Sequence, residues 1–287
     1  MHPPKLTIQN ICSEPPATSV GGGRAGAWLG STVVAVGLLI AGTSAHAQTE
    51  PEPSVGGSQS GGFVGLGLRT VPRYQGADEF KTSGIPAFSY QWSHGLFVGG
   101  SDGLVGYQNK ATEHLLLSVA LGMDEGRSAS DSRDLAGMGD ISARPTLNLH
   151  AKMTVVERLE VSASTQMGSG SDSKGGVVQL GASYGIPLNT TTRVRLHVKA
   201  TWANGDYMQD YFGVNPSQRA VAGYKVYTPG GGLRDVTVGV GVQHPLNAQW
   251  MLLGGLSHTT LSEAASASPL TRNSTYQSVF AALAYRF

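Results

Sequence analysis

The chain has 287 residues and a nearly balanced charge, since 20 lysines and arginines stand against 19 aspartates and glutamates. Without a strongly basic field, this composition argues against a protein that binds nucleic acid through charge. Charged residues make up only 14 % of the chain and glycines number 40, whereas a soluble domain averages about a quarter charged residues. A surface that faces lipid instead of water would account for the shortage.

The amino terminus is typical of a cleaved export signal. Arg24 precedes an apolar run, and the run ends in a small-x-small cleavage pattern before Gln48. A membrane anchor is the alternative, but the run is short for a span and no basic flank follows it. We predict that residues 1–47 are a leader and signal peptide, cleaved between Ala47 and Gln48. The single cysteine, Cys12, lies in this part, so the exported chain has no disulfide or thiol site.

After the signal, residues 48–60 are rich in Pro, Ser and Gly and predict a flexible periplasmic lead-in. Residues 61–287 then form one domain of strand-like segments. The last segment shows the pattern best, because Val279, Ala281 and Leu283 alternate with smaller or more polar residues up to the terminal Phe287. A period of two is typical of a strand with one apolar face. About nine to eleven residues is also the length that a tilted strand needs to cross a bilayer.

Eleven such segments follow one another, and no stretch shows a helical period. They are residues 61–70, 85–92, 96–107, 113–123, 140–150, 158–167, 177–188, 193–202, 236–242, 250–258 and 273–287. Short turns alternate with long loops, as in outer-membrane barrels. The segments are also longer than the five or six residues usual in a soluble sandwich, the alternative fold.

A barrel with both ends of its chain in the periplasm needs an even number of strands. The sequence Ser101-Asp102-Gly103 interrupts the segment at 96–107, and we interpret the break as a hairpin of two short strands. The predicted fold is therefore all-β: a transmembrane antiparallel up-and-down β-barrel of about twelve strands, with ten as the fallback. The predicted location is the cell outer membrane.

Basic residues share the polar face of several segments. The predicted lumen column consists of Arg193, Arg195, His197, Lys199, Arg144 and Arg158. These side chains must point inward in a barrel, because an Arg or Lys facing lipid near the midplane costs about 2–4 kcal/mol. The column either favours anionic or polar solutes or is a structural ladder paired with Glu160 and Asp235. Glycines such as Gly239 favour the second interpretation, since they indicate a narrow, packed interior.

Catalytic signals are poor. The chain has no HExxH, GxSxG or phosphate-loop pattern, and the spacing of its histidines selects no set. Asp206, Asp210 and the acidic residues from Asp124 to Asp140 are carboxylates of the type that binds a divalent cation, but we interpret them as solvated loop charges. We predict no enzyme activity, no cofactor and no metal site.

Several loop pieces carry a family resemblance. PRYQG stands at residues 72–76, LAGMGD at 135–140, YTPGG at 227–231 and a YRF ending at 285–287. The most specific pieces are Tyr211, Phe212, Gly213 and Val214, followed by Ser268 and Pro269. In this order they resemble the MipA/OmpV family of outer-membrane proteins, the MltA-interacting proteins.

The resemblance implies a scaffold that joins a murein lytic transglycosylase to a bifunctional murein synthase. A small pore for polar or anionic solutes and a surface adhesin or antigen are the alternatives. The family has no established catalytic residues to carry over. An aromatic ending such as Tyr285 and Phe287 resembles the signal that the barrel-assembly machinery recognises. The expected partners are therefore outer-membrane lipid, this machinery and the two murein enzymes, and not nucleic acid.

Overall fold

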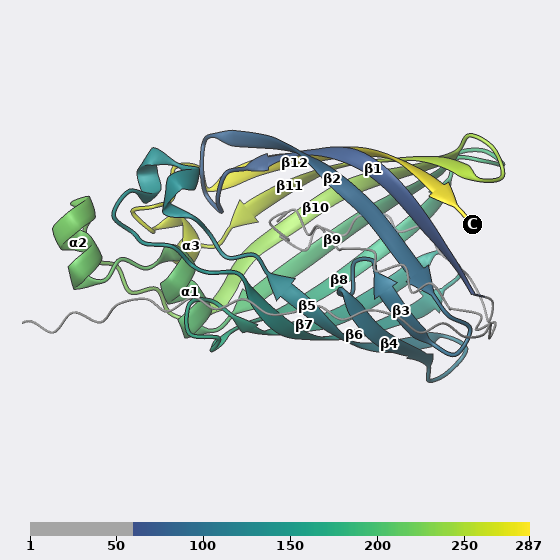
Figure 1. The fold of residues 1–287 in the computed structure, drawn as a ribbon, viewed down its shortest axis with the longest axis horizontal. Helices are drawn as coiled ribbons and strands as arrows, with labels where there is room; N and C mark the ends of the chain where they lie inside the picture. The colour runs from purple at the N-terminus through teal and green to yellow at the C-terminus, as the bar shows by residue number, and fades with distance from the viewer. Residues whose placement is uncertain (1–59) are drawn as a thin grey trace, which may run out of the picture. The chain divides into compact units, whose positions relative to one another are not determined.

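The computed structural model describes residues 60–287. The predicted leader, its cleavage site and residues 48–59 of the lead-in lie outside this part. The described residues form a closed barrel in which every neighbouring pair of strands is antiparallel and β1 closes against β12 (Figure 1). Its twelve strands are β1 Gly61–Pro72, β2 Phe80–Gln91, β3 Leu96–Gly99, β4 Val105–Lys110, β5 Leu115–Asp124, β6 Arg144–Val156, β7 Leu159–Ser169, β8 Gly175–Pro187, β9 Arg193–Ala203, β10 Gly232–Pro245, β11 Trp250–Leu261 and β12 Thr275–Arg286.

The predicted fold is confirmed, including the strand count. The break at Ser101-Asp102-Gly103 is the turn between β3 and β4, which have four and six residues. Neither the ten-strand fallback nor a soluble sandwich describes this barrel.

The alternation of side chains sets the two faces of the wall. On β9 the apolar Leu196 and Val198 are 44 % and 45 % exposed on the outside. On β12 the outward Val279 and Leu283 are exposed, whereas the inward Ala284 is buried. The outer surface is therefore an apolar band, as a barrel in lipid requires.

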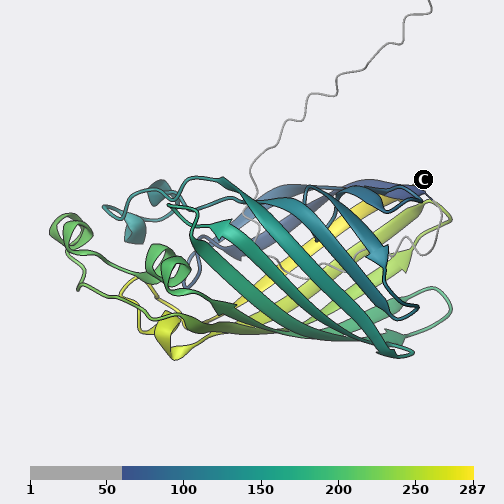
Figure 2. The same cartoon turned by 90° about the horizontal axis from the view of Figure 1, so that it is seen from below.

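The two ends of the barrel differ, and both views show it (Figures 1 and 2). At one end, the short-turn end, connections of two to five residues join the strands. At the other, the long-loop end, the connections reach 28 residues and carry every helix of the described part. By the usual orientation of such barrels, the short turns face the periplasm and the long loops the outside.

Although no stretch of the sequence shows a helical period, the loops contain short helices. The long loops contain α1 Gly205–Phe212, α2 Pro216–Ala222, α3 Glu263–Ser266 and the 3-10 turns η1 Ala129–Asp131 and η2 Arg133–Leu135. Each is too short to show a helical period. Among the described residues, no helix is long and apolar enough to span a membrane.

The predicted strand boundaries also shift. The second segment was predicted to begin at residue 85, yet β2 begins at Phe80, and β10 begins at Gly232 instead of 236. In both cases pairing with a neighbour extends the strand past its alternating pattern, because β1 pairs with β2 as far as Pro72 and Phe80.

Candidate functional site

The long-loop end is closed by a compact assembly of loops. We call it the cap and define it as residues 73–79, 125–143, 204–231 and 262–274. The last three of these loops carry all the helices of the described part. These segments are distant in sequence but gather at one end in both views (Figures 1 and 2).

Helix α1 is the apolar centre of the cap. Asn204 precedes it and accepts a hydrogen bond from the amide of Tyr207 at 3.0 Å, which is the usual way to satisfy a free donor at a helix start. Met208 and Phe212 are fully buried. The cluster around them is formed by Ile141, Val177, Ala203, Tyr207, Tyr211, Leu261, Ala265 and Tyr276. Since Val177, Ala203 and Tyr276 are strand residues, α1 packs onto the inner mouth of the barrel.

A first polar cluster lies beside α1 around Tyr207. Its hydroxyl accepts hydrogen bonds from Gln75 Nε2 at 2.9 Å and from Arg234 Nη1 at 2.8 Å. Arg234 is also paired with Asp235, and both are nearly inaccessible to water. The Tyr207 ring stacks on Tyr211, with centroids 4.4 Å apart. These contacts join the loop at 73–79, helix α1 and strand β10.

A second polar cluster is built around Asp124, at the end of β5. Its carboxylate accepts bonds from the Tyr211 hydroxyl at 2.8 Å, from the Ser169 hydroxyl and from the Gly170 amide at 2.9 Å. Burial raises the pKa of Tyr211, so this phenol stays protonated and donates. Arg127 Nη1 donates to the Tyr211 carbonyl at 2.8 Å. Asp124 therefore fastens α1 to two neighbouring loops.

The family-like loop pieces meet in the cap. The Ser268 hydroxyl donates to the Phe212 carbonyl at 2.6 Å, and the Tyr74 hydroxyl donates to the Leu270 carbonyl at 2.9 Å. Val214 and Leu270 are buried together with Met138. Pieces far apart along the chain thus make one structure, in which Gly213 is the C-cap of α1.

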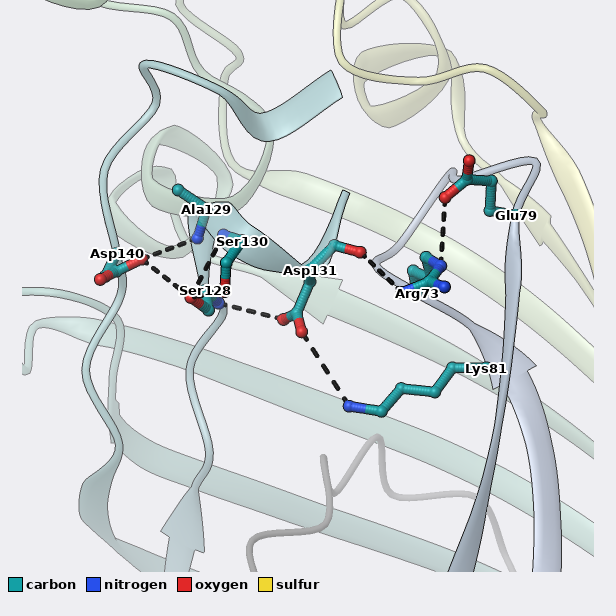
Figure 3. Close-up of polar contacts among 8 residues, drawn as sticks. All are labelled: Arg73, Glu79, Lys81, Ser128, Ala129, Ser130, Asp131 and Asp140. Atoms are coloured by element: carbon teal, nitrogen blue, oxygen red, sulfur yellow. Dashed lines mark hydrogen bonds and ion pairs between the residues drawn. The ribbon is translucent and has the colours of Figure 1, made fainter. Parts of the chain in front are cut away.

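The rim of the cap is polar and more exposed. Arg272 pairs with Asp134 and lies over the Tyr224 ring. The hydrogen bond from Arg272 holds the pKa of Asp134 below its usual value. Figure 3 shows the next contacts, in which Arg73 donates to the Asp131 carbonyl at 3.0 Å and Lys81 lies 4.0 Å from the Asp131 carboxylate. These contacts tie the β1–β2 hairpin to the loop at 125–143.

The predicted basic residues do not all come together. Arg193, Arg195, His197 and Lys199 lie on the inward side of β9, where Arg195 pairs with Glu160 of β7 at 3.3 Å. A Cβ added to Gly239 would lie 2.5 Å from the His197 ring, so this glycine makes room for that side chain.

The other two basic residues lie elsewhere. Arg144 begins β6 at the long-loop end and donates to Ser173 at 3.2 Å. Arg158 lies in the two-residue turn between β6 and β7, beside Glu157. Because it is not on a strand, it does not extend the column.

The ending of the chain closes the barrel at the short-turn end. The Phe287 amide donates to the Gly62 carbonyl at 3.0 Å, and the Gly62 amide donates back at 3.1 Å. The Phe287 ring stacks on Tyr90, and Tyr285 packs edge-on against Trp250. Both predicted assembly residues thus lie at the seam between the first and last strands.

Sequence reasoning missed the polar clusters of the cap. Gln75 stands in the PRYQG piece at residues 72–76, but nothing in the sequence showed that it contacts Tyr207. Asp124 was expected to be a solvated loop charge, yet its carboxylate accepts bonds from Tyr211, Ser169 and Gly170. Asp210 was expected to be solvated, yet it accepts bonds from the amide and hydroxyl of Ser171, both at 2.7 Å. Among residues 60–287, no group of histidines, cysteines and carboxylates could hold a metal ion.

A family model decides the relationship of the chain. The model of the MltA-interacting protein MipA matches residues 64–287. The chain belongs to the MipA family. Together with the closed barrel, membership makes it an outer-membrane β-barrel protein. The two most specific pieces of this MipA-family protein, residues 211–214 and 268–269, both lie in its cap. A search of curated proteins returned no match.

Solved structures with a similar outline are also barrels. The KdgM porin matches with 9 % identity and a TM-score of 0.42, covering 78 % of this chain and 99 % of its own. The outer membrane channel DcaP of Acinetobacter baumannii matches with 11 % identity and a TM-score of 0.38, covering 80 % of this chain and 96 % of its own. Likeness at this level carries no argument about activity.

Proposed function

We propose that this protein is a non-enzymatic outer-membrane scaffold that holds murein-remodelling enzymes at the periplasmic side of the membrane. The partners would be a murein lytic transglycosylase and a bifunctional murein synthase. Membership of a family described as MltA-interacting supports the first of them. The apolar outer band would contact lipid, and the ending at Phe287 would be recognised by the barrel-assembly machinery.

The observation that carries this proposal is the cap. Buried side chains of α1 pack across the mouth of the barrel. This packing supports a long-loop end that is closed and is not the entrance of a wide pore. Partners in the periplasm then meet only the short-turn end and the lead-in before it. Function at that end needs a binding surface and no channel.

Two neighbouring turns at this end offer such a surface. Leu188, after β8, is 63 % exposed, and Leu246, after β10, is 55 % exposed. Thr192 and His244 link the bases of β9 and β10 through a hydrogen bond of 2.9 Å. Because the two turns are neighbours, we infer that these leucines belong to one apolar patch that a periplasmic partner covers.

The test is capture of the two enzyme classes from solubilised outer membranes. The parent chain is expected to retain a lytic transglycosylase, and Leu188→Glu/Leu246→Glu is expected to lose it. Val221→Glu is the matched control, because Val221 is 76 % exposed on α2 at the opposite end. If the parent captures neither a murein hydrolase nor a murein synthase, the scaffold proposal fails.

A small pore is the second candidate, favoured by the basic side chains on the inward face of β9. Single-channel recording would detect it, and Arg193→Glu/Arg195→Glu would shift its ion selectivity toward cations. A parent chain without conductance would eliminate this candidate and leave the scaffold unaffected.

A further inference from the structure

The wall of the barrel is incomplete between β2 and β5. Strand β3 pairs with β2 at only three positions, from Ser89 to Gln91. On the other side, pairing of β4 with β5 ends at Leu121. Within the described residues, no strand lies between residues 80–87 of β2 and residues 122–124 of β5. We call this stretch the wall gap.

The tip of the β3–β4 hairpin does not fill the gap, because it turns into the lumen. The Asp102 carboxylate accepts a hydrogen bond from Ser118 at 2.8 Å. The Asp102 carbonyl accepts one from Asn148 at 3.1 Å and lies 3.1 Å from His150 Nε2. Ser118, Asn148 and His150 all belong to the inward face of β5 and β6. The tip is thus held on the inner wall at mid-height.

The gap lies at the depth of the apolar band. Leu66 and Leu68 of β1 stand opposite Pro86 and Gly84, and they are the two most exposed leucines of the band, at 74 % and 63 %. On the far side Leu121 is 56 % exposed. Exposed leucines on both sides place the opening against hydrocarbon and not above it.

The free edge of β2 is built to stay without a partner strand. Phe88 accepts the last backbone bond on this side, from Gly100 at 3.1 Å. Since backbone groups alternate between the two sides of a strand, Pro86 and Gly84 also face the gap. Proline has no N–H to offer and is found at sheet edges. This edge therefore disfavours pairing with a strand of another protein.

The gap joins two apolar surfaces. Just inside it, the inward Ile85, Phe97 and Ala120 are buried side chains on the lumen wall. Irregular backbone at membrane depth is tolerated where it lines a cavity rather than lipid alone. Above the gap, Lys81 of β2 lies 4.0 Å from the Asp131 carboxylate of the cap (Figure 3). Apolar side chains thus border the wall gap on its outer side and on its inner side.

We propose that the wall gap is a lateral portal through which a single-chain anionic amphiphile passes between the lumen and the membrane. Its acyl chain enters the gap between the exposed Leu68 and Leu121 and displaces the packing at Ile85. Its head group meets the basic side chains on the inward face of β9, among them Arg193 and Arg195. Because the cap covers the long-loop end, the portal is the route by which the amphiphile leaves the lumen on that side. This portal is independent of any murein partner.

The portal is tested by asking whether lipid chains reach an inward-facing residue beside it. The full chain carrying Cys12→Ser and Ile85→Cys is labelled with bimane and placed in vesicles whose phospholipids have brominated acyl chains. The label is expected to lose fluorescence. The same label on Ser164→Cys, which faces the lumen from the fully paired strand β7, is expected to keep it. Heat-modifiable gel mobility verifies that each variant is folded.

A second pair of variants separates entry through the gap from general leakiness. Gly84 and Gly254 both face outward, and a Cβ added to either would meet only a carbonyl oxygen, at 4.0 and 3.7 Å. Gly84→Trp is expected to abolish the quenching at Ile85→Cys, and Gly254→Trp on the fully paired β11 is expected to leave it unchanged. Equal quenching at Ile85→Cys and Ser164→Cys would overturn the portal. So would thiol cross-linking between two copies through Thr82→Cys, because it would assign the edge to strand pairing.

Discussion

At the short-turn end the strands reverse within a few residues, whereas at the long-loop end they run into a cap with a core of its own. Most contacts of the short turns are local, as where Asn247 Oδ1 accepts from the Trp250 amide at 2.8 Å. The cap instead depends on long-range contacts, such as the bond between Tyr74 and Leu270. The short-turn end is stabilised by hydrogen bonds within its turns and by the seam between β1 and β12. The long-loop end is stabilised by tertiary packing of the cap.

This difference has a consequence for how the ends fail. A change in one short turn disturbs one hairpin, and only the seam at Phe287 affects the whole ring. A change in the cap reaches several loops at once, because Asp124 and α1 contact each of them. We therefore expect the cap to open without opening of the barrel.

Removal of Phe287 should have the largest effect. Its backbone bonds with Gly62 and its stacking on Tyr90 complete the seam, and the aromatic ending is the proposed assembly signal. The deletion is expected to abolish most assembled barrel in membranes, measured as heat-modifiable protein. Phe287→Trp keeps the aromatic ring and is expected to assemble. Normal levels of the deleted chain would refute this role.

Phe212→Ala should give the next largest effect, confined to the cap. The side chain is fully buried, and truncation of a buried Phe costs about 3–5 kcal/mol. Hydrogen exchange in α1 is expected to accelerate while exchange in the strands stays slow. Trp250→Ala at the short-turn end is the counterpart, since Trp250 is 40 % exposed, and it should leave the cap unchanged. Uniform acceleration in both regions would show that the ends are coupled.

Asp124→Asn tests whether the cap is held by charge as well as by packing. The carboxylate accepts from Tyr211, Ser169 and Gly170, and a hydrogen bond to a charged group contributes about 1.5–3 kcal/mol. We expect the free energy of cap opening to fall by about 2–3 kcal/mol. Asp172→Asn in an exposed loop should change it by less than about 0.5 kcal/mol. Protection of α1 against proteolysis measures both.

The sequence predicted the strands of this protein well and the cap poorly, for a physical reason. Strand β9 alternates along its whole length because one face meets the membrane and the other the lumen. The first half of β2 does not, since Thr82, Gly84 and Pro86 occupy its outward positions beside the wall gap. The alternation of side chains therefore did not predict the first half of β2, because the barrel wall is irregular there.

The helices of the cap escaped prediction because they are short, with eight residues in α1 and seven in α2. Local signals were present: Asn215 and Gln218 form a capping box around Pro216, which is a readable start of a helix. The contacts between loops were not readable, because Ser268 and Phe212 are brought together by the closed barrel. The loop pieces that carry the family resemblance include these residues, but the sequence did not show that they contact each other in the cap.

The smallest effect is expected from pH at the rim of the cap. Arg272 holds the pKa of Asp134 below its usual value through a hydrogen bond. A lowered carboxyl pKa means that the pair stabilises the cap above the ordinary Asp pKa of about 4 and that this contribution is lost as pH falls through the lower value. Hydrogen exchange at residues 133–138 should therefore accelerate in acid while α1 stays protected. Asp134→Asn should show the faster exchange already at neutral pH, without further acid dependence. If the parent rim stays equally protected below the pKa of Asp134, the pair does not hold the cap, and its closure rests on the buried clusters alone.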